Sequence, residues 1–337
     1  MSLLALLTAG TIDTGPSPGW SPLDLPPLPP VSDAPTPGPF SDTRPFTTYL
    51  VPIETADGSG ATLHPDVLDM HALFGAPVRG YRYWLSHTPF PQQDGTLENP
   101  HLAVSNNGYD WHSTEVGIQN PIHPLPAGVG YQSDPDLWWN PEEKHFGWAW
   151  RQQGGGGHNI VASTSTDLLT WTPTVKVGWS AHAPIEDKAP ALARLAPYQW
   201  KIWMVRGSEL WRFDSTRPHQ KWTGGQKCTI NDPAGQPMVH DFWHGNVLRL
   251  DDGMLIGAWT TGGSAFGGTI AGHSTDDGLT WILGATRIFP GVTYSYRPAL
   301  ALDDDGTHVH LWDSTTVNGT KYLHVSRVPL TVFTDPT

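Results

Sequence analysis

Apolar and polar residues alternate along short runs of the chain from about residue 60 onward, and each run ends at a turn. Phe146, Trp148 and Trp150, for example, share one face of such a run. A period of two residues predicts half-buried β-strands, and the Gly, Pro, Asn and Asp residues between runs predict turns. The 36 glycines and 33 prolines agree with many turns and few long helices. The pattern therefore predicts an all-β protein.

Five segments repeat one pattern, in which a polar or proline-marked start leads into an apolar strand, a short turn and an aromatic strand. The same place in each segment is taken by Pro65, Pro135, Pro190, Gly245 and Pro298, at gaps of about 55 residues with one near 70. Repeating antiparallel units of this length predict a five-bladed β-propeller over residues 46–337. The segment that begins at Phe46 is expected to add an outer strand to the last blade and so close the ring.

A further turn motif closes the repeating unit. Ser274, Asp276, Gly278, Thr280 and Trp281 follow the spacing of the Asp-box of sialidase-type propellers, and "VSNNGYDW" and "ASTSTDLLTW" are weaker copies. Ser and Asp bond turn backbone, Gly allows positive φ and Trp fills the space between sheets. We therefore interpret the motif as structural.

Residues 1–45 form a separate region. Eleven prolines stand between Pro16 and Pro45, which excludes a helix or a central strand and predicts an extended, polyproline-like arm. The two alternatives are a disordered linker and an arm that docks onto a partner.

Charge and composition exclude several classes of function. The net charge of −13, with only 19 Lys and Arg residues, argues against nucleic acid and anionic membranes as partners. No apolar stretch approaches the roughly 20 residues of a membrane span, so no membrane insertion is expected. The N-terminal "MSLLALLTAG" has no basic residue before its apolar part, and we do not interpret it as a secretory signal. The single cysteine, Cys228, excludes an internal disulfide.

The innermost strands of a propeller surround its axis, so the residues at their starts are expected to converge on one face. Asp134 and Asp136 are two residues apart and share a strand face, which directs both toward the same axial pocket. The converging set is His64, Asp66, Asp134, Asp136, Glu186, Asp187, Lys188, His240, Asp241, His244, Tyr296 and Arg297. A buried polar network that fills the axial channel is the structural alternative to a functional site.

The stretches "GYRYWLSHTPFP…ENPHLAVSNNGYDW" and "NPIHPLPAGVGYQSDPDL" resemble five-bladed propellers of phage tail and bacterial surface proteins. Those propellers are similar in turn to the arabinanase and β-xylosidase clan of glycoside hydrolases. The clan uses three acidic residues, and the resemblance places its helper at Asp134. It places the base at His64 and the acid at Lys188, neither of which is a carboxylate. Nearby acids are the substitutes, so the candidate catalytic residues are Asp66, Asp134, Asp136 and Glu186.

We predict from this resemblance and from the arm an extracellular phage virion protein, at the tail tip or a minor tail position, that recognises a host surface glycan in the axial pocket. The arm would dock to other virion proteins. The candidate ligand-binding residues are His64, Lys188, Asp241, Trp243, His244, Tyr296 and Arg297. Aromatic rings stack on the apolar faces of sugars, and Trp138, Trp139 and Tyr294 are further candidate platforms.

Several alternatives stay open at this point. One is a glycoside hydrolase acting on pentose- or furanose-rich cell-wall polysaccharide, with Asp66 or Asp136 as base and Glu186 as acid. Another is a purely structural tail protein with a vestigial pocket. We discount a sialidase, because only Arg297 is at a first-strand start and a sialidase needs an arginine cluster. No cofactor is predicted; an axial metal ion held by His64, His240 and His244 is an alternative that we do not predict.

Overall fold

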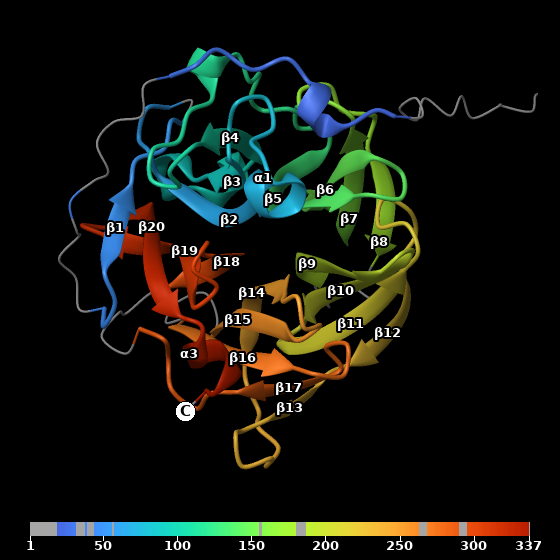
Figure 1. Cartoon of the computed structure of the whole chain (residues 1–337), viewed down its shortest axis with the longest axis vertical. Helices are drawn as coiled ribbons and strands as arrows, with labels where there is room; N and C mark the ends of the chain where they lie inside the picture. Colours follow the sequence, from blue (N-terminus) through green and yellow to red (C-terminus); the bar gives the residue numbers. More distant parts are fainter. Residues whose placement is uncertain are drawn as a thin grey trace, which may run out of the picture.

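The computed structural model describes residues 19–31, 38, 44–55, 57–154, 157–179, 187–262, 268–289 and 295–336. Glu186 and Tyr294 therefore lie outside the described residues. Five sheets are arranged radially around a common axis, as Figure 1 shows. The structure confirms the all-β, five-bladed propeller that the sequence predicts.

Each blade is built from strands that are consecutive in the chain, except that β1 joins the last blade. Blade 1 contains β2 (Thr62–Asp69), β3 (Tyr83–Pro89) and β4 (His101–Ser105), and blade 2 contains β5 (Val129–Asn140), β6 (His145–Gly154), β7 (Gly157–Ser165) and β8 (Val175–Trp179). Blade 3 contains β9 (Asp187–Ala196), β10 (Gln199–Arg206), β11 (Glu209–Ser215) and β12 (Thr223–Lys227). Blade 4 contains β13 (Thr229–Asn231), β14 (Phe242–Arg249), β15 (Leu255–Thr261), β16 (Gly268–Ser274) and β17 (Thr280–Leu283), and blade 5 contains β18 (Tyr296–Leu302), β19 (His308–Val317), β20 (Thr320–Pro329) and β1 (Thr48–Val51).

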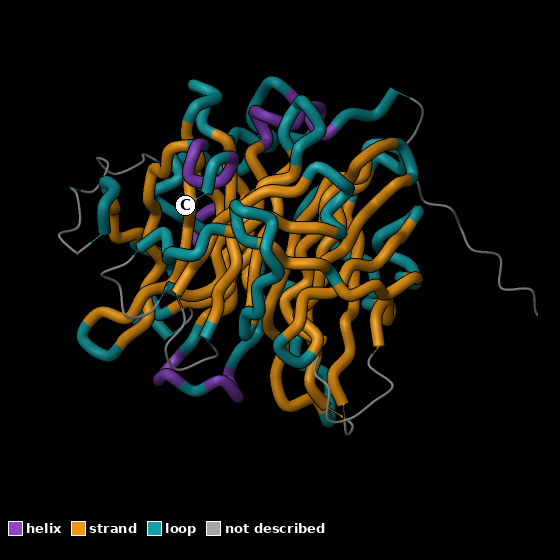
Figure 2. Tube along the Cα trace, turned by 90° about the horizontal axis from the view of Figure 1, so that it is seen from below, coloured by secondary structure: helices purple, strands orange, loops and turns teal. Residues whose placement is uncertain are grey.

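The helices are short and lie at the edges of the propeller, as Figure 2 shows. They are η1 (Pro22–Asp24), α1 (Met70–Phe74), η2 (Pro91–Gln93), η3 (Gly95–Leu97), η4 (Thr114–Val116) and α3 (Thr331–Thr334). No helix in the described part of the chain is long and apolar enough to span a membrane.

The ring is closed by a strand from the start of the propeller region. β1 pairs antiparallel with β20, with Thr48 opposite Ser326 and Val51 opposite Leu323. The last blade thus contains strands from both ends of the chain, and the outer edge of β20 is covered. This pairing confirms the closure expected for the segment that begins at Phe46.

Part of the proline-rich region packs on the propeller itself. Leu28 is buried against blades 1 and 2, and its backbone N–H donates to the carbonyl of Arg79 at 2.9 Å. The Tyr81 hydroxyl donates to the carbonyl of Pro29 at 2.8 Å, and Arg79 donates to that of Pro26. Residues 19–31 therefore lie across the outside of the propeller (Figure 1). Docking of the arm to other proteins stays a prediction.

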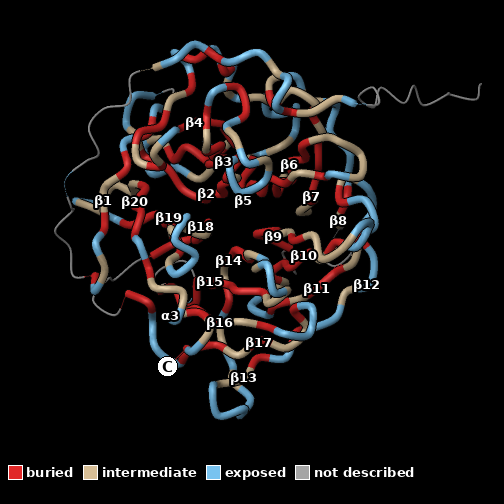
Figure 3. Tube along the Cα trace, viewed as in Figure 1, coloured by how far each residue is buried: buried red, intermediate tan, exposed pale blue. Residues whose placement is uncertain are grey.

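Tryptophans fill the spaces between neighbouring sheets. The side chains of Trp84, Trp148, Trp150, Trp203, Trp259, Trp281 and Trp312 are fully buried. Figure 3 shows the buried residues concentrated in the strands around the axis, with exposed residues mainly in the peripheral loops. Packing between blades thus accounts for many of the 17 tryptophans in the chain.

The Asp-box turn has the structural role that the sequence predicts. The Ser274 hydroxyl accepts from the N–H of Gly278 at 3.0 Å, and Asp276 accepts from that of Thr280 at 2.8 Å. Trp281 Nε1 and Trp203 Nε1, from the neighbouring blade, both donate to the Gly278 carbonyl. The turns that end at Trp111 and Trp171 repeat these bonds from Ser105 and Ser165.

Gly278→Ala tests this turn, because Gly278 has φ +74° and an added Cβ would lie 2.2 Å from Cζ2 of Trp203. We expect the left-handed backbone and the clash to lower the free energy of unfolding by about 2–5 kcal/mol. Gly306→Ala is the control: its φ is +64° and no atom lies within 4 Å of the added Cβ. That change should cost only about 1–2 kcal/mol. Equal losses in urea denaturation would contradict the packing role.

Two buried histidines of blade 1, His87 and His101, are expected to make the free energy of unfolding depend on pH. Burial lowers the pKa of His87 well below its usual value, and His101, 5.8 Å away between ring centroids, lowers it further. Unfolded His87 takes up a proton below a pH of about 6.5 while the folded side chain stays neutral, so this residue's contribution to stability is lost as pH falls.

As pH falls below about 6, the free energy of unfolding should therefore decrease less steeply in His87→Gln than in the wild type. The difference between the two slopes should be up to about 1.4 kcal/mol per pH unit. Denaturant titrations at pH 7.5, 6 and 5 measure this slope. His71→Gln, which changes an exposed histidine, should leave it unchanged. An unchanged slope in His87→Gln would exclude a buried neutral His87.

Candidate functional site

The start of every inner strand carries an irregularity in pairing. The register shifts at Leu63/Asp66 in β2 and at Ser133/Asp136 in β5, and corresponding shifts occur in β9, β14 and β18. In four blades the residue before the proline has positive φ, and these residues are His64 (54°), Asp134 (58°), Ala189 (53°) and Arg297 (38°). Non-glycine residues in this region cost about 1–3 kcal/mol each and concentrate at functional sites, and bulges redirect side chains.

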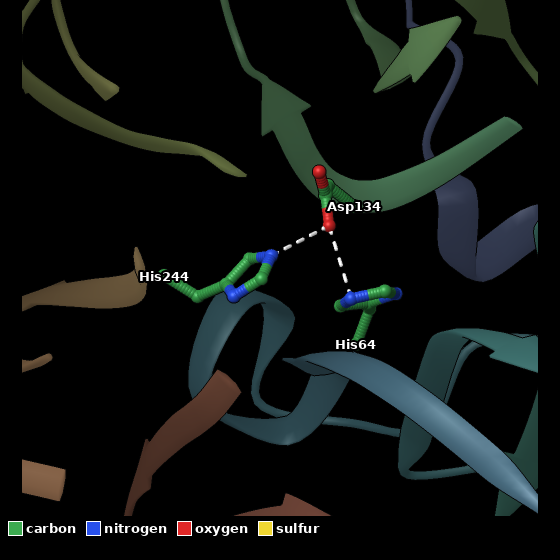
Figure 4. A group of neighbouring side chains, drawn as sticks. All are labelled: His64, Asp134 and His244. Atoms are coloured by element: carbon green, nitrogen blue, oxygen red, sulfur yellow. Dashed lines mark hydrogen bonds and ion pairs between the residues drawn. The ribbon is translucent and has the colours of Figure 1, made fainter. Parts of the chain in front are cut away.

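Asp134 is the centre of the group that these bulges bring together. Its Oδ1 lies 3.1 Å from Nε2 of His64 and 2.9 Å from Nε2 of His244, as Figure 4 shows. Arg297 Nη1 lies 3.9 Å from the same oxygen. We call His64, Asp134, His244 and Arg297 the axial cluster; blades 1, 2, 4 and 5 each contribute one member, and all four are buried.

The charges of the axial cluster are set by burial and by the neighbouring charge of Arg151. Burial opposes ionisation of Asp134, but Arg151 and the two histidines hold its pKa well below the usual value. Burial lowers the pKa of His64 well below its usual value and that of His244 to about 4, although Asp134 opposes both shifts. The site therefore presents two neutral imidazoles and one carboxylate at neutral pH.

Two arginines hold Asp134 and the inner strands in place. Arg151 Nε lies 3.0 Å from Oδ2 of Asp134, on the side away from the histidines. Arg297 Nη2 donates to the carbonyls of Pro135 at 2.6 Å and Pro190 at 3.2 Å. Arg297 thus connects blade 5 to blades 2 and 3, which is a positioning role.

Glu98, after η3, is a site residue that the inner-strand pattern did not reveal. Burial raises the pKa of Glu98 to about 8, and the nearby charge of Asp134 raises it further, while Arg151 and a hydrogen bond with Ser133 oppose the shift. A carboxyl group that titrates near neutral pH is suited to general acid–base catalysis. Its sequence signal was the "ENP" stretch, which entered only through the resemblance.

Aromatic and basic side chains lie next to the axial cluster. Trp243 Nε1 donates to the Tyr296 hydroxyl at 2.6 Å, and that hydroxyl lies 3.4 Å from Nε2 of His244. Lys188 Nζ lies 3.2 Å from the centroid of the Trp243 ring, so an ammonium group covers one face of the indole. Lys321 Nζ lies 5.5 Å from the Tyr296 ring centroid. Trp243 is half-buried, as a sugar-binding residue at the edge of a pocket would be.

Asp66 and Asp136 form a second layer, two residues further along β2 and β5. Asp66 accepts hydrogen bonds from the N–H of Leu137 and from Asn246, so it links blades 1, 2 and 4. Burial raises the pKa of Asp66 to about 6, and burial together with Asp66 raises that of Asp136 well above its usual value. This pair resembles the polar network that fills an axial channel more than an open carboxylate pair.

The structure brings together most of the residues predicted from the strand starts. His64, Asp134, His244, Arg297, Tyr296, Lys188 and Trp243 lie in one connected group. Asp241 is exposed and takes no part in the described contacts of this group, and the His240 ring packs against that of Phe242 at a tilt of 58°. Trp138 and Trp139 pack in the hydrophobic core. Glu186 and Tyr294 lie outside the described residues.

The donor atoms of the axial cluster fit a divalent metal ion. One atom each from His64, Asp134 and His244 lies within 4.8 Å of the others. Nε2 of His64 is buried without a hydrogen-bond partner among the described residues, and Nε2 of His244 is hydrogen-bonded to Asp134 Oδ1 at 2.9 Å. Two imidazoles and a carboxylate form a donor set that occurs in catalytic zinc sites. The histidine-only set considered from the sequence thus differs in one member, because Asp134 stands where His240 was expected.

Comparison with known proteins adds to this picture. No protein-family model matches the chain. Over 123 residues, the chain is 32% identical to the A type blood N-acetyl-α-D-galactosamine deacetylase of Flavonifractor plautii. The match covers 35% of this chain and spans 15% of the length of that curated relative.

Solved structures share the fold over most of the chain. An N-acetylgalactosamine deacetylase from F. plautii, in complex with blood group B trisaccharide, has a TM-score of 0.66 at 17% identity and covers 91% of this chain and 95% of its own. An endo-arabinase from Bacteroides thetaiotaomicron has a TM-score of 0.58 at 10% identity, covering 82% and 97%. An α-L-arabinanase from Penicillium chrysogenum has a TM-score of 0.55 at 16% identity, covering 82% and 80%. These likenesses establish the fold and confirm the structural similarity to the arabinanase and β-xylosidase clan.

The proteins that the chain resembles are carbohydrate-active enzymes. The enzymatic alternative therefore has more support than the virion interpretation. The virion location, the tail partners and the host glycan stay predictions.

Proposed function

We propose that the chain is a metal-assisted hydrolase that removes the acetyl group from an N-acetylated amino sugar in a glycan. The observation that carries the proposal is the convergence of His64 Nε2 and His244 Nε2 on one carboxylate oxygen of Asp134. The similarity to a deacetylase supports the choice of an amide bond.

The arrangement of acids favours amide hydrolysis over glycosidic cleavage. The places of the clan's base and acid are taken by His64 and Lys188. Asp66 and Asp136 also have raised pKa values, but both accept hydrogen bonds from neighbouring blades. Glu98, whose pKa is raised to about 8, lies outside this second layer. Glycosidases need two carboxyl groups on opposite sides of the scissile bond, whereas a metal-assisted amide hydrolase needs one.

Different residues of this chain would bind the metal ion, transfer protons and position the ligands. His64, Asp134 and His244 would hold the metal ion, which supplies a Lewis acid that polarises the amide carbonyl and acidifies water. The ionised fraction of Glu98, which grows as pH rises toward its pKa of about 8, accepts a proton from the attacking water and then delivers it to the amine leaving group. Arg151 keeps Asp134 ionised and in position.

The neighbouring side chains supply binding of the sugar. The exposed part of Trp243 stacks on an apolar sugar face, and Tyr296, whose hydroxyl is oriented by Trp243 Nε1, reaches the reacting group from beside His244. Lys188 and Lys321 place positive charge around these rings.

An assay that separates the products tests the proposal. The full chain is incubated with oligosaccharides ending in α- or β-linked N-acetylgalactosamine or N-acetylglucosamine, with and without EDTA. Release of acetate and appearance of a free amine, with no new reducing ends and with loss in EDTA, supports the proposal. New reducing ends would show a glycoside hydrolase instead, and binding without any product would support the glycan-recognition interpretation.

A further inference from the structure

A second group of metal-ligating side chains lies at the boundary between blades 2 and 3. It consists of Glu143 in the turn between β5 and β6, His145 at the start of β6, and His219 in the loop between β11 and β12. We call these three residues the interblade site. Asp134 lies at the bulge of β5, whereas the interblade site lies past the C-terminal end of that strand, so the two sites are separate.

One distance in the interblade site equals the spacing of zinc ligands and a second is 0.4 Å longer. Glu143 Oε2 lies 3.5 Å from Nδ1 of His219 and 3.9 Å from Nε2 of His145. Zinc bonds of about 2.0–2.1 Å in a tetrahedral arrangement place neighbouring ligand atoms roughly 3.3–3.5 Å apart. The two rings meet at 82° with centroids 4.8 Å apart, so they do not stack on each other.

The two nitrogen atoms that point at Glu143 are buried and lack another partner. Nε2 of His145 and Nδ1 of His219 have no hydrogen-bond partner among the described residues. Burial lowers the pKa of His145 to about 3 and that of His219 to about 4, so both rings are neutral at physiological pH. A neutral imidazole nitrogen without a hydrogen-bond partner carries a cost that a metal ion removes.

The surrounding residues hold Glu143 in place. Arg217 Nε lies 2.9 Å from the other carboxylate oxygen, Oε1, and Asn140 Nδ2 donates to Oε2 at 2.9 Å. A carboxylate oxygen accepts more than one bond, so Oε2 keeps a position toward the histidines. The charge of Arg217 balances that of Glu143 and leaves neutral nitrogen donors, which select a borderline cation over Mg²⁺ or Ca²⁺.

We propose that Glu143, His145 and His219 bind Zn²⁺, or a divalent cation of similar preference, as a structural clip between blades 2 and 3. Such a clip stabilises the native state, because a ligand that binds only the folded chain shifts the unfolding equilibrium. It joins two sheets by a route independent of the core tryptophans.

Counting bound metal in matched variants tests the clip. The full chain is stripped with EDTA, dialysed and titrated with ZnCl₂, and bound zinc is measured by elemental analysis. We expect two equivalents in the wild type, one in His219→Gln, one in His244→Gln and none when both changes are combined. His71→Gln, an exposed histidine, should match the wild type.

Failure of the clip is distinguishable from failure of the axial metal site. If only the axial site fails, the wild type holds one equivalent and His219→Gln holds none. Zinc should raise the Tm of His244→Gln but not that of the combined variant, and deacetylation by His219→Gln should be retained. Glu143→Gln provides a second variant should His219→Gln fold poorly, as judged by circular dichroism. Equal zinc content and affinity in the wild type, His219→Gln and Glu143→Gln would overturn the proposal.

Discussion

Asp134→Asn is expected to abolish hydrolysis and to weaken metal binding by at least about 100-fold. Even residues that only support metal ligands cost about 10–100-fold in affinity when they are changed, and Asp134 contacts both histidines directly. The change also leaves Arg151 and Arg297 buried without their carboxylate, so the free energy of unfolding should fall by about 3–5 kcal/mol. Zinc titration, acetate release and urea denaturation measure the three effects.

Asp241→Asn is the matched control for this change. Asp241 is a carboxylate predicted from the same strand starts, but it is exposed and outside the axial cluster. It should keep wild-type metal content, activity and stability. Full activity in Asp134→Asn, or an equal loss in both variants, would rule out the central role of Asp134.

Glu98→Gln is expected to lower kcat by about 10²–10⁴-fold while metal binding, KM and fold are kept. The reason for the selective effect is the raised pKa of about 8, which leaves Glu98 largely protonated at pH 7, and an amide has nearly the same shape as that neutral form. The amide cannot transfer the proton, and general acid–base catalysis contributes about this factor.

Steady-state kinetics and zinc content separate this result from a structural defect. Glu209→Gln serves as control, because Glu209 is exposed and pairs with Lys227 in blade 3. A purely structural role for Glu98 would lower stability and metal content together with kcat. Unchanged kcat in Glu98→Gln would remove it from the mechanism.

The strand starts were predictable because one feature of the chain marks them. Pro65, Pro135, Pro190 and Pro298 each follow the residue that takes the bulge, and the repeat of this pattern placed His64, Asp134 and Arg297 around one axis. Alternation along β5 also predicted Asp136 on the same side of the strand as Asp134, but the register shift between Ser133 and Asp136 interrupts that alternation. Local pattern and repeat length were sufficient for the fold and for this part of the site.

Other parts of the site depend on how the blades rotate against one another, which no local pattern encodes. Glu98 is on a loop of blade 1, and Arg151 is on the second strand of blade 2, so neither belongs to the inner-strand series. That Asp134 pairs with His244, and not with His240, depends on the register shift between Phe242 and His244. Asp241 was predicted from its position in the chain, but it precedes β14 and is exposed.

The interblade site was missed for a similar reason. Glu143 and His145 belong to one hairpin, yet His219 is more than seventy residues away and meets them only through the contact between two sheets. A Glu and a His close together in a turn are common on protein surfaces. Only the addition of His219 makes Glu143 and His145 a candidate metal site.

The residues of the candidate site lie at equivalent bulges, whereas the residues that hold the blades together lie at other positions. Each blade presents one residue at the same backbone position, and the tryptophans and Asp-box turns that hold the blades together lie elsewhere. A single substitution at one of these positions changes the donor set at the axis without replacing any of the tryptophans that pack between the sheets. Blade 3 illustrates this freedom, because it carries only the methyl group of Ala189 there. Proteins with this fold can therefore evolve different activities by changing the residues at the bulges.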